Sequence, residues 1–285
     1  MKETSEDPRI VAANRCYDAY IFDLDGTIYL GDALLPGAQR LIIELRNRKR
    51  IVRFISNNPT KTPEQYAEKL TRLGLPTAVE DITNTVVSMT RWLLAHYPDA
   101  VVFPISEQPL IDALADAGIR MSHNPAEIDI VIASYDRSFS YEKLQIAFDA
   151  IWFYKRARLI ATNPDRYCPM PGGRGEPDAA AITAAIEACT NTKCEVVVGK
   201  PDPVMVQAAL TGTNVQPENC VVVGDRLSTD IRMAHDAGMD AALVPTGETK
   251  MTDLQHISPC DAPRFVLDRI DRLLPPDLWQ ELGWR

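Results

Sequence analysis

The sequence of 285 residues lacks several features that mark particular classes of protein. No apolar run approaches the roughly 20 residues that a membrane helix needs, and the N-terminus, MKETSEDPR, is polar and acidic, unlike a secretory signal. The six cysteines contain no CxxC pair, so we expect free thiols in a reducing compartment and not a disulfide framework. A net charge of -9 leaves no basic footprint for nucleic acid. These absences predict a cytoplasmic protein that binds neither membranes nor nucleic acids.

Histidine is scarce, and the acidic residues outnumber the basic ones. The four histidines are isolated in the sequence and show no metal-ligand spacing, so we expect them on the surface or in packing. With 39 acidic and 30 basic residues, the overall field repels anions. An anionic ligand would therefore need a local cation to hold it. Apolar residues make up 46% of the chain, which is ample for a buried core.

Short apolar runs alternate with amphipathic stretches at both ends of the chain. The strand-like CYDAYIFDL and IVRFIS are followed by the helix-like GAQRLIIELRNRK and PEQYAEKLTRLG, and the rhythm returns with CEVVVG, NCVVVG and AALVP. Strands that are apolar on both faces and separated by helices predict a parallel sheet covered on both sides. We therefore expect an α/β fold with a doubly wound parallel sheet, whose functional groups collect beyond the carboxyl ends of the strands.

The middle of the chain has an alternation of its own, from VVFPIS through IDIVIAS and RLIATN to the helix-like AAAITAAIEAC. This pattern predicts a smaller α/β domain of residues 84–194 inserted into a core of residues 1–83 and 195–285. Within the insertion, NPDRYCPMPGGRGEPD is expected to be an irregular loop, and Trp152, Phe153 and Tyr154 to pack in the core. The C-terminal PRFVLDRIDRLLPP predicts one closing helix.

The first strand ends in DLDGT, which places two carboxylates on the same side of a strand. Strand periodicity directs Asp23 and Asp25 to one face while the leucine between them points away. Where an EF-hand needs a third oxygen ligand, a glycine and a bidentate glutamate, this chain has Thr27, Ile28 and Leu34. A phosphate-binding GxxxxGK[ST] loop is also missing. Two exposed turn aspartates remain the simplest alternative for this motif taken alone.

Other strand ends carry polar groups that complement those carboxylates. Ser56, Asn57 and Asn58 follow IVRFIS and could bind an anionic oxygen, although an ordinary helix cap is the alternative. Asp225 follows NCVVVG, and Asp230 lies one helical turn later, where an acid also complements a helix dipole. Lys200 sits in the loop GKPDP, where a lysine is most often a solvated surface charge.

Taken together, these endings predict a phosphate site. Three carboxylates at one sheet edge, Asp23, Asp25 and Asp225, would repel one another unless a cation lay among them. A hard divalent ion with oxygen ligands fits, and Mg²⁺ is the common choice at phosphate sites. Lys200 would add a second positive charge and Ser56 a neutral donor. A phosphoryl group is the anion that needs all three.

The same motifs resemble a known family. DLDGT at 23–27, SNN at 56–58, the GKP lysine and GDRLSTD at 224–230 are similar to the four ordered motifs of the haloacid dehalogenase (HAD) superfamily. The insertion resembles the large C2-type cap of its NagD-like, type IIA phosphatases. The resemblance extends from about Tyr17 to the C-terminal region, and it implies a Rossmann-like core with a cap that selects the substrate.

The resemblance implies roles for individual residues. Asp23 would be the nucleophile that forms an aspartyl-phosphate, and Asp25 the general acid and base. Mg²⁺ would be held by Asp23, the backbone carbonyl of Asp25, and Asp225, while Asp230 supports that site or orients Lys200. Ser56, Lys200 and the backbone at Asn57 would hold the phosphoryl oxygens. Gly26 and Thr27 in the turn, and Asn58, would have supporting roles.

Specificity would reside in the cap. The candidate residues lie in two loops of the insertion and are Asn163, Asp165, Arg166, Asp136 and Arg137. Before the last cap helix, Glu176-Pro177-Asp178-Ala179 departs from the Pro-Gly-x-Gly turn of many relatives. Association of two copies through the cap is also compatible with the resemblance.

The expected activity is a Mg²⁺-dependent phosphatase acting on small phosphorylated metabolites. Sugar phosphates come first, and phosphoglycolate, nucleoside monophosphates and 4-nitrophenyl phosphate are the alternatives. The second aspartate argues for phosphate, because dehalogenases of the superfamily lack it. Two rivals remain: a phosphotransferase or mutase with the same intermediate, and a non-catalytic metabolite-binding protein on this scaffold.

Overall fold

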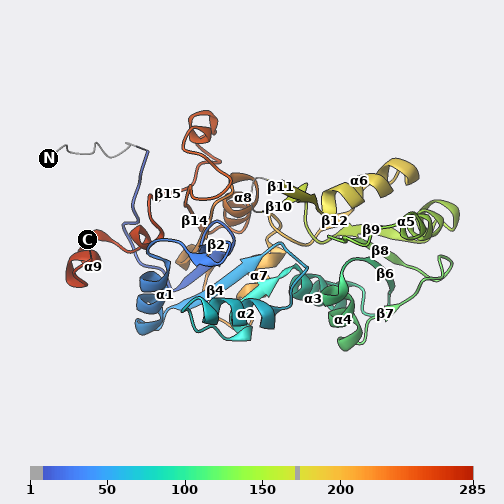
Figure 1. The fold of residues 1–285 in the computed structure, drawn as a ribbon, viewed down its shortest axis with the longest axis horizontal. Helices are drawn as coiled ribbons and strands as arrows, with labels where there is room; N and C mark the ends of the chain where they lie inside the picture. The colour runs from blue at the N-terminus through green and yellow to red at the C-terminus, as the bar shows by residue number, and fades with distance from the viewer. Residues whose placement is uncertain (1–8, 171–173, 285) are drawn as a thin grey trace. The chain divides into compact units, whose positions relative to one another are not determined.

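The computed structural model describes residues 9–170 and 174–284 (Figure 1). Its contacts divide the chain into two units: Met1–Ile55, Ala67–Ile82 and Ala209–Arg285 form the first, and Ser56–Tyr66 and Thr83–Ala208 the second. The domain division expected from the sequence differs from this one at residue 83 and in two segments, 56–66 and 195–208, all of which the sequence division places in the core. Among the described residues, no helix is both long and apolar enough to cross a membrane.

The first unit is built on a sheet that is six-stranded in the described residues, with the order β15-β14-β13-β1-β4-β5. β1 pairs in parallel with β13 on one side and β4 on the other, and β13–β14 and β14–β15 are parallel too. The order runs outward from β1 in both directions, which confirms the predicted doubly wound α/β fold. The strands are β1 (Ala19–Asp23), β4 (Ile51–Ser56), β5 (Ile82–Asn84), β13 (Cys220–Gly224), β14 (Asp240–Leu243) and β15 (Phe265–Val266).

Burial explains why β1 is central. All five of its residues are buried, and so are all five of β13, as expected for strands covered on both faces. Tyr20 and Phe22 stack on one face at a ring distance of 6.4 Å, and Phe22 contacts Phe54 of β4 at 6.1 Å. The other elements of this part of the chain are the hairpin β2 (Tyr29–Leu30) and β3 (Ala33–Leu34) and the helices α1 (Ala38–Asn47), α2 (Pro63–Arg72), α8 (Arg232–Asp236) and α9 (Pro276–Glu281).

The second unit contains its own parallel sheet, with five strands in the order β12-β9-β8-β6-β7 among the described residues. Its α3 and α4 cover one face and α5 and α6 the other (Figure 1). Successive side chains of a strand point to opposite faces of the sheet, so Val102 packs toward α3 and Phe103 toward α5. The elements are α3 (Thr85–His96), β6 (Val101–Ile105), α4 (Gln108–Asp116), β7 (Arg120–Met121), β8 (Ile130–Ala133), α5 (Tyr141–Phe148), β9 (Arg158–Ala161), α6 (Ala179–Thr190), β12 (Val196–Val197) and α7 (Val204–Ala209).

The sequence pattern predicted that CEVVVG would be a strand of the core sheet, and this prediction was wrong. Only Val196 and Val197 are in strand conformation, and they pair with Ile160 and Ala161 of β9. Apolar residues fit either sheet, so the pairing partner decides the assignment. As a result, the loop with Lys200 leaves from the second unit's sheet.

The Pro/Gly-rich segment of the insertion contains an antiparallel ribbon, so the prediction of an irregular loop was wrong. β10 (Tyr167–Met170) pairs with β11 (Arg174–Pro177), with Pro169 opposite Gly175. A two-stranded ribbon consists of edges alone, and proline is tolerated there because its outer side needs no N–H donor. Residues 171–173 lie outside the described residues.

Two further expectations were wrong. Residues 263–276, predicted as one closing helix, form β15 and a 3₁₀ turn (Ile270–Leu273) instead, because residues 265–266 pair with β14, and α9 begins only at Pro276. Trp152, Phe153 and Tyr154 do not pack in a core, since 54%, 64% and 47% of their surfaces are exposed. Trp152 and Phe153 lie in a π-helical extension of α5, Asp149–Phe153, and Tyr154 follows it as the C-cap. The buried positions of this extension are Ala150 and Ile151.

We expect Cys220 to make the stability of the first unit sensitive to alkaline pH. The thiol is buried at the start of β13 and donates to the carbonyl of Gln216 at 3.3 Å, and burial raises its pKa from 9.0 to about 11. Because the folded protein holds this proton more tightly, the stabilisation is complete below pH 9 and is lost as the pH rises through 11. We expect Cys220→Ala to remove about 2–3 kcal/mol of the alkaline loss in urea unfolding between those values. Cys260→Ala, at an exposed thiol, is the control, and an unchanged pH profile in Cys220→Ala would contradict the assignment.

Candidate active site

The DLDGT turn fixes the end of β1. Asp23 is the last residue of the strand and pairs with Ile55 of β4. Leu24 is buried, and its carbonyl accepts from the backbone of Ile28 at 2.9 Å. Gly26 has a φ of +87°, a left-handed conformation that favours glycine, so the chain reverses immediately after the strand. Asp23 therefore stands at the carboxyl edge of the sheet on a rigid strand end.

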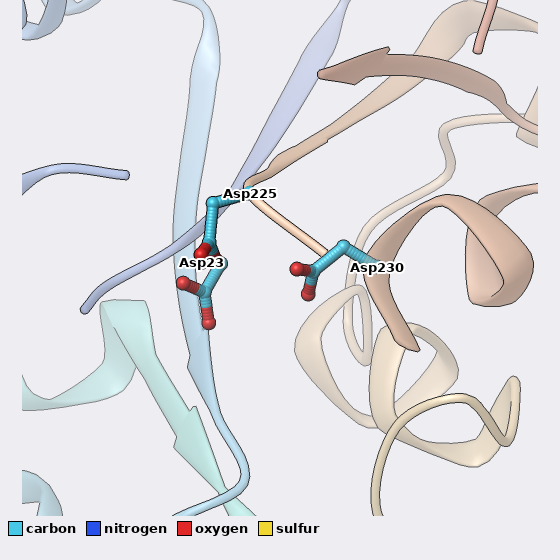
Figure 2. Close-up of side chains that lie close together, drawn as sticks. All are labelled: Asp23, Asp225 and Asp230. Atoms are coloured by element: carbon cyan, nitrogen blue, oxygen red, sulfur yellow. The ribbon is translucent and has the colours of Figure 1, made fainter. Parts of the chain in front are cut away.

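Three carboxylates meet at this edge (Figure 2). Oxygen atoms of Asp23, Asp225 and Asp230 all lie within 4.8 Å of one another, and Figure 2 shows the Asp230 carboxylate directed toward the other two. Asp225 follows β13, the neighbour of β1, and Asp230 lies in the π-helical turn Leu227–Ile231. Their exposed fractions are only 7%, 3% and 0%. Topology thus brings Asp23 together with two acids that lie about 200 residues later in the chain.

Backbone amides and glycines hold the cluster. The N–H of Glu248 donates to Asp225 Oδ2 at 2.7 Å, and the N–H of Arg226 donates to Asp230 Oδ2 at 3.1 Å. A Cβ on Gly247 would lie 1.9 Å from Asp225 Oδ2, and one on Gly224 would lie 2.3 Å from the Cβ of Asp230. Both positions must therefore be glycine. The sequence interpretation overlooked Gly247, although a glycine just beyond AALVP was a signal for it.

The cluster fits a hard divalent cation. All three side chains offer carboxylate oxygen, which Mg²⁺ prefers, and like charges buried this closely are costly without a cation. The two glycines let the backbone pack directly against Asp225 and Asp230, which fixes the position of both carboxylates. The donor set therefore suits a metal site of the kind the sequence suggests.

Asp25 differs from the sequence expectation. Its side chain is exposed and accepts a hydrogen bond from the Tyr29 hydroxyl at 3.1 Å. In the described residues the carboxylate cluster contains Asp230 where the strand pattern suggested Asp25. The pattern fails because β1 ends at Asp23, so alternation no longer orients Asp25. The implied metal ligand from Asp25 is its backbone carbonyl, and that role stays a prediction, as does its acid–base role.

Ser56 and Asn58 form a tight polar turn after β4. Ser56 is buried, and its Oγ lies 3.3 Å from the Tyr66 hydroxyl and accepts from the N–H of Asn58 at 3.2 Å. The Asn58 amide oxygen accepts from the N–H of Thr60 at 2.9 Å, and its Nδ2 lies 3.9 Å from Cys168 Sγ. Asn58 thus closes a local turn and is not a helix cap, because α2 begins at Pro63 and Thr62 and Gln65 exchange the hydrogen bonds at its start. The amide nitrogen of Asn58 lies near β10.

Asn57, Lys200 and two of the cap candidates belong to one buried hydrogen-bond network. Lys200 is 3% exposed and Asn57 7%, so this lysine is not a solvated surface charge. Asn57 Nδ2 donates to Asp165 Oδ2, and Asn163 Nδ2 donates to the carbonyl of Asn57, both at 3.1 Å. Arg166 is exposed. The structure therefore places Asn163 as a support of this network and leaves Asp165 half-buried at its margin.

The other two cap candidates are held in local ion pairs. Asp136 is buried, accepts from Ser138 Oγ at 2.6 Å and pairs with Lys143 Nζ at 2.5 Å. Arg137 Nη2 donates to Glu107 Oε2 at 2.6 Å, and this carboxylate raises the pKa of the arginine. These contacts give both residues a structural role, and a role in substrate contact stays a prediction.

Glu176, where the sequence departs from many relatives, has a specific partner. The buried Tyr135 hydroxyl donates to its carboxylate, and burial together with this acid raises the pKa of Tyr135. Arg137 Nη1 lies 4.0 Å from the same carboxylate. The contact ties β11 to the loop after β8, and sequence reasoning did not identify Tyr135.

Family models match both ends of the chain. Residues 20–120 match a haloacid dehalogenase-like hydrolase model, and residues 197–273 match a HAD-hydrolase-like model. The sugar-phosphatase AraL of Bacillus subtilis is 35% identical over 88% of this chain and 89% of its own length. An acid sugar phosphatase of Staphylococcus epidermidis is 33% identical over 84% of this chain and 90% of its own.

Solved structures agree with this grouping. The 4-nitrophenylphosphatase of Thermotoga maritima is 31% identical, with a TM-score of 0.83 over 90% of this chain and 96% of that one. NagD of E. coli K-12 is 25% identical, with a TM-score of 0.80 over 90% of this chain and 98% of that one. The predicted relationship is confirmed: the chain belongs to the haloacid dehalogenase-like hydrolases and is a NagD-like phosphatase of that family.

Proposed function

We propose that this phosphatase hydrolyses phosphate monoesters of small metabolites, sugar phosphates above all, through an aspartyl-phosphate at Asp23 and with Mg²⁺ as its cofactor. The observation that carries the proposal is the buried cluster of Asp23, Asp225 and Asp230 at the edge of the parallel sheet. The names of the relatives, sugar phosphatases and 4-nitrophenylphosphatases, support the substrate class. We also propose that it works in a reducing cytoplasm, in keeping with six free thiols.

In the first proposed step, a carboxylate oxygen of Asp23 attacks phosphorus while the bond to the leaving oxygen breaks. Asp25 gives its proton to that oxygen, and its exposed position lets it exchange protons with solvent. Ser56, Lys200 and the backbone at Asn57 hold the phosphoryl oxygens. When bound, by Asp23, Asp225 and the Asp25 carbonyl, Mg²⁺ supplies positive charge that offsets the carboxylates and the phosphoryl group.

In the second step, Asp25 takes a proton from water, whose oxygen bonds to phosphorus while the bond to Asp23 breaks. Phosphate is set free, and the Asp23 carboxylate and the protonated Asp25 are restored, so atoms and charges balance over the cycle. Dividing the displacement in this way replaces one difficult reaction with two easier ones. Asp230 contributes charge and hydrogen-bonding capacity beside the nucleophile, where its carboxylate is fixed by the N–H of Arg226.

A panel of phosphate esters tests the substrate class. Released phosphate would be measured for sugar phosphates, phosphoglycolate, nucleoside monophosphates and 4-nitrophenyl phosphate with Mg²⁺ present. We expect kcat/KM to be highest for a sugar phosphate, by about tenfold or more over the nucleotides, since binding energy from the leaving group contributes to kcat/KM. A preference for nucleoside monophosphates, or phosphate passing to an added sugar with none set free, would contradict the proposal.

A further inference from the structure

The side-chain carboxamide of Asn57 forms two hydrogen bonds with the backbone of Lys200. Its Oδ1 accepts from the N–H of Lys200 at 2.8 Å, and its Nδ2 donates to the carbonyl of Lys200 at 3.1 Å. A residue held through both its N–H and its C=O has little freedom in φ and ψ, so its Cα–Cβ direction is fixed. Both residues are buried, where water does not compete for these bonds.

Asn57 is itself anchored by neighbours that are fully buried. Its carbonyl accepts from Thr85 Oγ1 at 2.9 Å and from Asn163 Nδ2 at 3.1 Å. The second hydrogen of its Nδ2 is directed to Asp165 Oδ2 at 3.1 Å. Both amide hydrogens and the amide oxygen are thus engaged within the protein. The side chain is committed to holding Lys200 and the Asp165 loop, so it is not a ligand for substrate.

The backbone of Gly199, next to Lys200, packs directly against this network and leaves no space for a side chain. A Cβ on Gly199 would lie 2.4 Å from the carbonyl oxygen of Thr162 and 2.8 Å from Asn57 Oδ1. Any side chain there would push Lys200 away from the carboxamide. Gly199 is therefore required by the same hydrogen-bond network, which joins the loops at 56–58, 162–165 and 199–200.

We propose that Asn57 is a positioning residue for Lys200: its side chain sets the place of the lysine that binds the phosphoryl group, and it links that lysine to Asp165 of the cap loop. This inference rests on the proposed function, because it needs Lys200 to act on phosphate. It assigns the Asn57 side chain a task separate from the backbone contact expected from the sequence. Displacing a charged group by about 1 Å costs on the order of 10²-fold in rate.

A double-mutant cycle tests the inference. We expect Asn57→Ala and Lys200→Met each to lower kcat/KM by ~10²-fold, and the double variant to be no worse than Lys200→Met alone, because Asn57 acts through the lysine. The affinity for inorganic phosphate in the presence of Mg²⁺, measured by calorimetry, should show the same coupling without any turnover. If the losses caused by the two single substitutions instead multiply in the double variant, both in kcat/KM and in phosphate affinity, the proposal is overturned.

Asn84→Ala is the matched control, because Asn84 is also buried and its side-chain hydrogen bonds go to Lys61 and Val87, outside the loops at 56–58, 162–165 and 199–200. It accepts from the N–H of Val87 at 3.2 Å as the cap of α3 and donates to the carbonyl of Lys61 at 2.7 Å. We expect Asn84→Ala to lower the melting temperature while leaving the phosphate affinity within about twofold of the wild type. Its small effect on kcat/KM should multiply with the effect of Lys200→Met, as for two independent sites. An equal loss of phosphate affinity in Asn84→Ala would show that Asn57 matters only for stability.

Asn57→Asp gives a second, isosteric variant. It keeps the acceptor for the Lys200 N–H but turns a second acceptor toward the Lys200 carbonyl and Asp165, so it should weaken phosphate binding as Asn57→Ala does. Wild-type binding in this variant would overturn the proposal. The two levels of the account fail separately: a wild-type protein that releases no phosphate from any ester refutes the proposed function, whereas an active wild type with no coupling refutes only the role of Asn57.

Discussion

Asp23→Asn should lower phosphate release by at least ~10⁴-fold, the scale of loss seen when a nucleophile is removed. The amide keeps the size of the carboxylate at the end of β1 but cannot attack phosphorus. Because the substitution also removes one of three charges buried within 4.8 Å of one another, the fold should not be weakened in the absence of metal. Phosphate release with 4-nitrophenyl phosphate and thermal unfolding measure the two effects.

Asp32→Asn is the control for this variant. Asp32 is an exposed acid of the same unit whose carboxylate lies 3.4 Å from Arg72 Nη2, so its loss should leave turnover unchanged. Near-normal turnover in Asp23→Asn would refute the nucleophile assignment. Loss of activity accompanied by unfolding would show instead that the substitution disrupts the strand end.

Removal of the divalent cation should silence the enzyme reversibly. A chelator would leave three buried carboxylates facing one another, with nothing to neutralise the approaching phosphate, and added Mg²⁺ should restore turnover. Asp225→Asn should raise the Mg²⁺ concentration needed for half-maximal activity by ~10–100-fold, because one ligand charge is lost.

Calorimetric titration with Mg²⁺ checks the same prediction without turnover. The wild type and Asp32→Asn should bind alike, and Asp225→Asn should bind much more weakly. Full activity after exhaustive chelation would contradict the metal assignment, and so would equal Mg²⁺ affinity in the wild type and Asp225→Asn.

The core fold was predictable because its strands leave little choice. AYIFD and CVVVG are buried on both faces, so only a covered parallel sheet accommodates them. The closing helix was predicted wrongly because PRFVLDRIDRLLPP looks amphipathic in isolation. In the structure the buried Asp271 pairs with Arg40 and Arg269, and its carbonyl accepts from the Trp279 indole at 2.9 Å. Arg40 lies 231 residues away in the sequence and Trp279 lies in the next helix, and these contacts override the local pattern.

The site was predictable where residues stand on strand ends and less so where they stand on turns. Asp23 ends β1 and Asp225 directly follows the neighbouring β13, so the parallel sheet alone brings them together. Asp25 lies beyond the strand and Asp230 within a π-helical turn, and alternation orients neither of them. The close fit of Gly247 against Asp225 depends on the path of a loop, which sequence periodicity does not describe.

The most direct test of the account is to identify the phosphorylated residue. Asp25→Asn should react with 4-nitrophenyl phosphate, whose leaving group needs little protonation, and then stall because no base activates water. After quenching in acid and digestion with pepsin, mass spectrometry should find a base-labile phosphoryl group on the peptide with Asp23, and none when Asp23 is also changed to asparagine. A phosphoryl group on another residue, or an Asp25→Asn variant that turns over at the wild-type rate without one, would contradict the account.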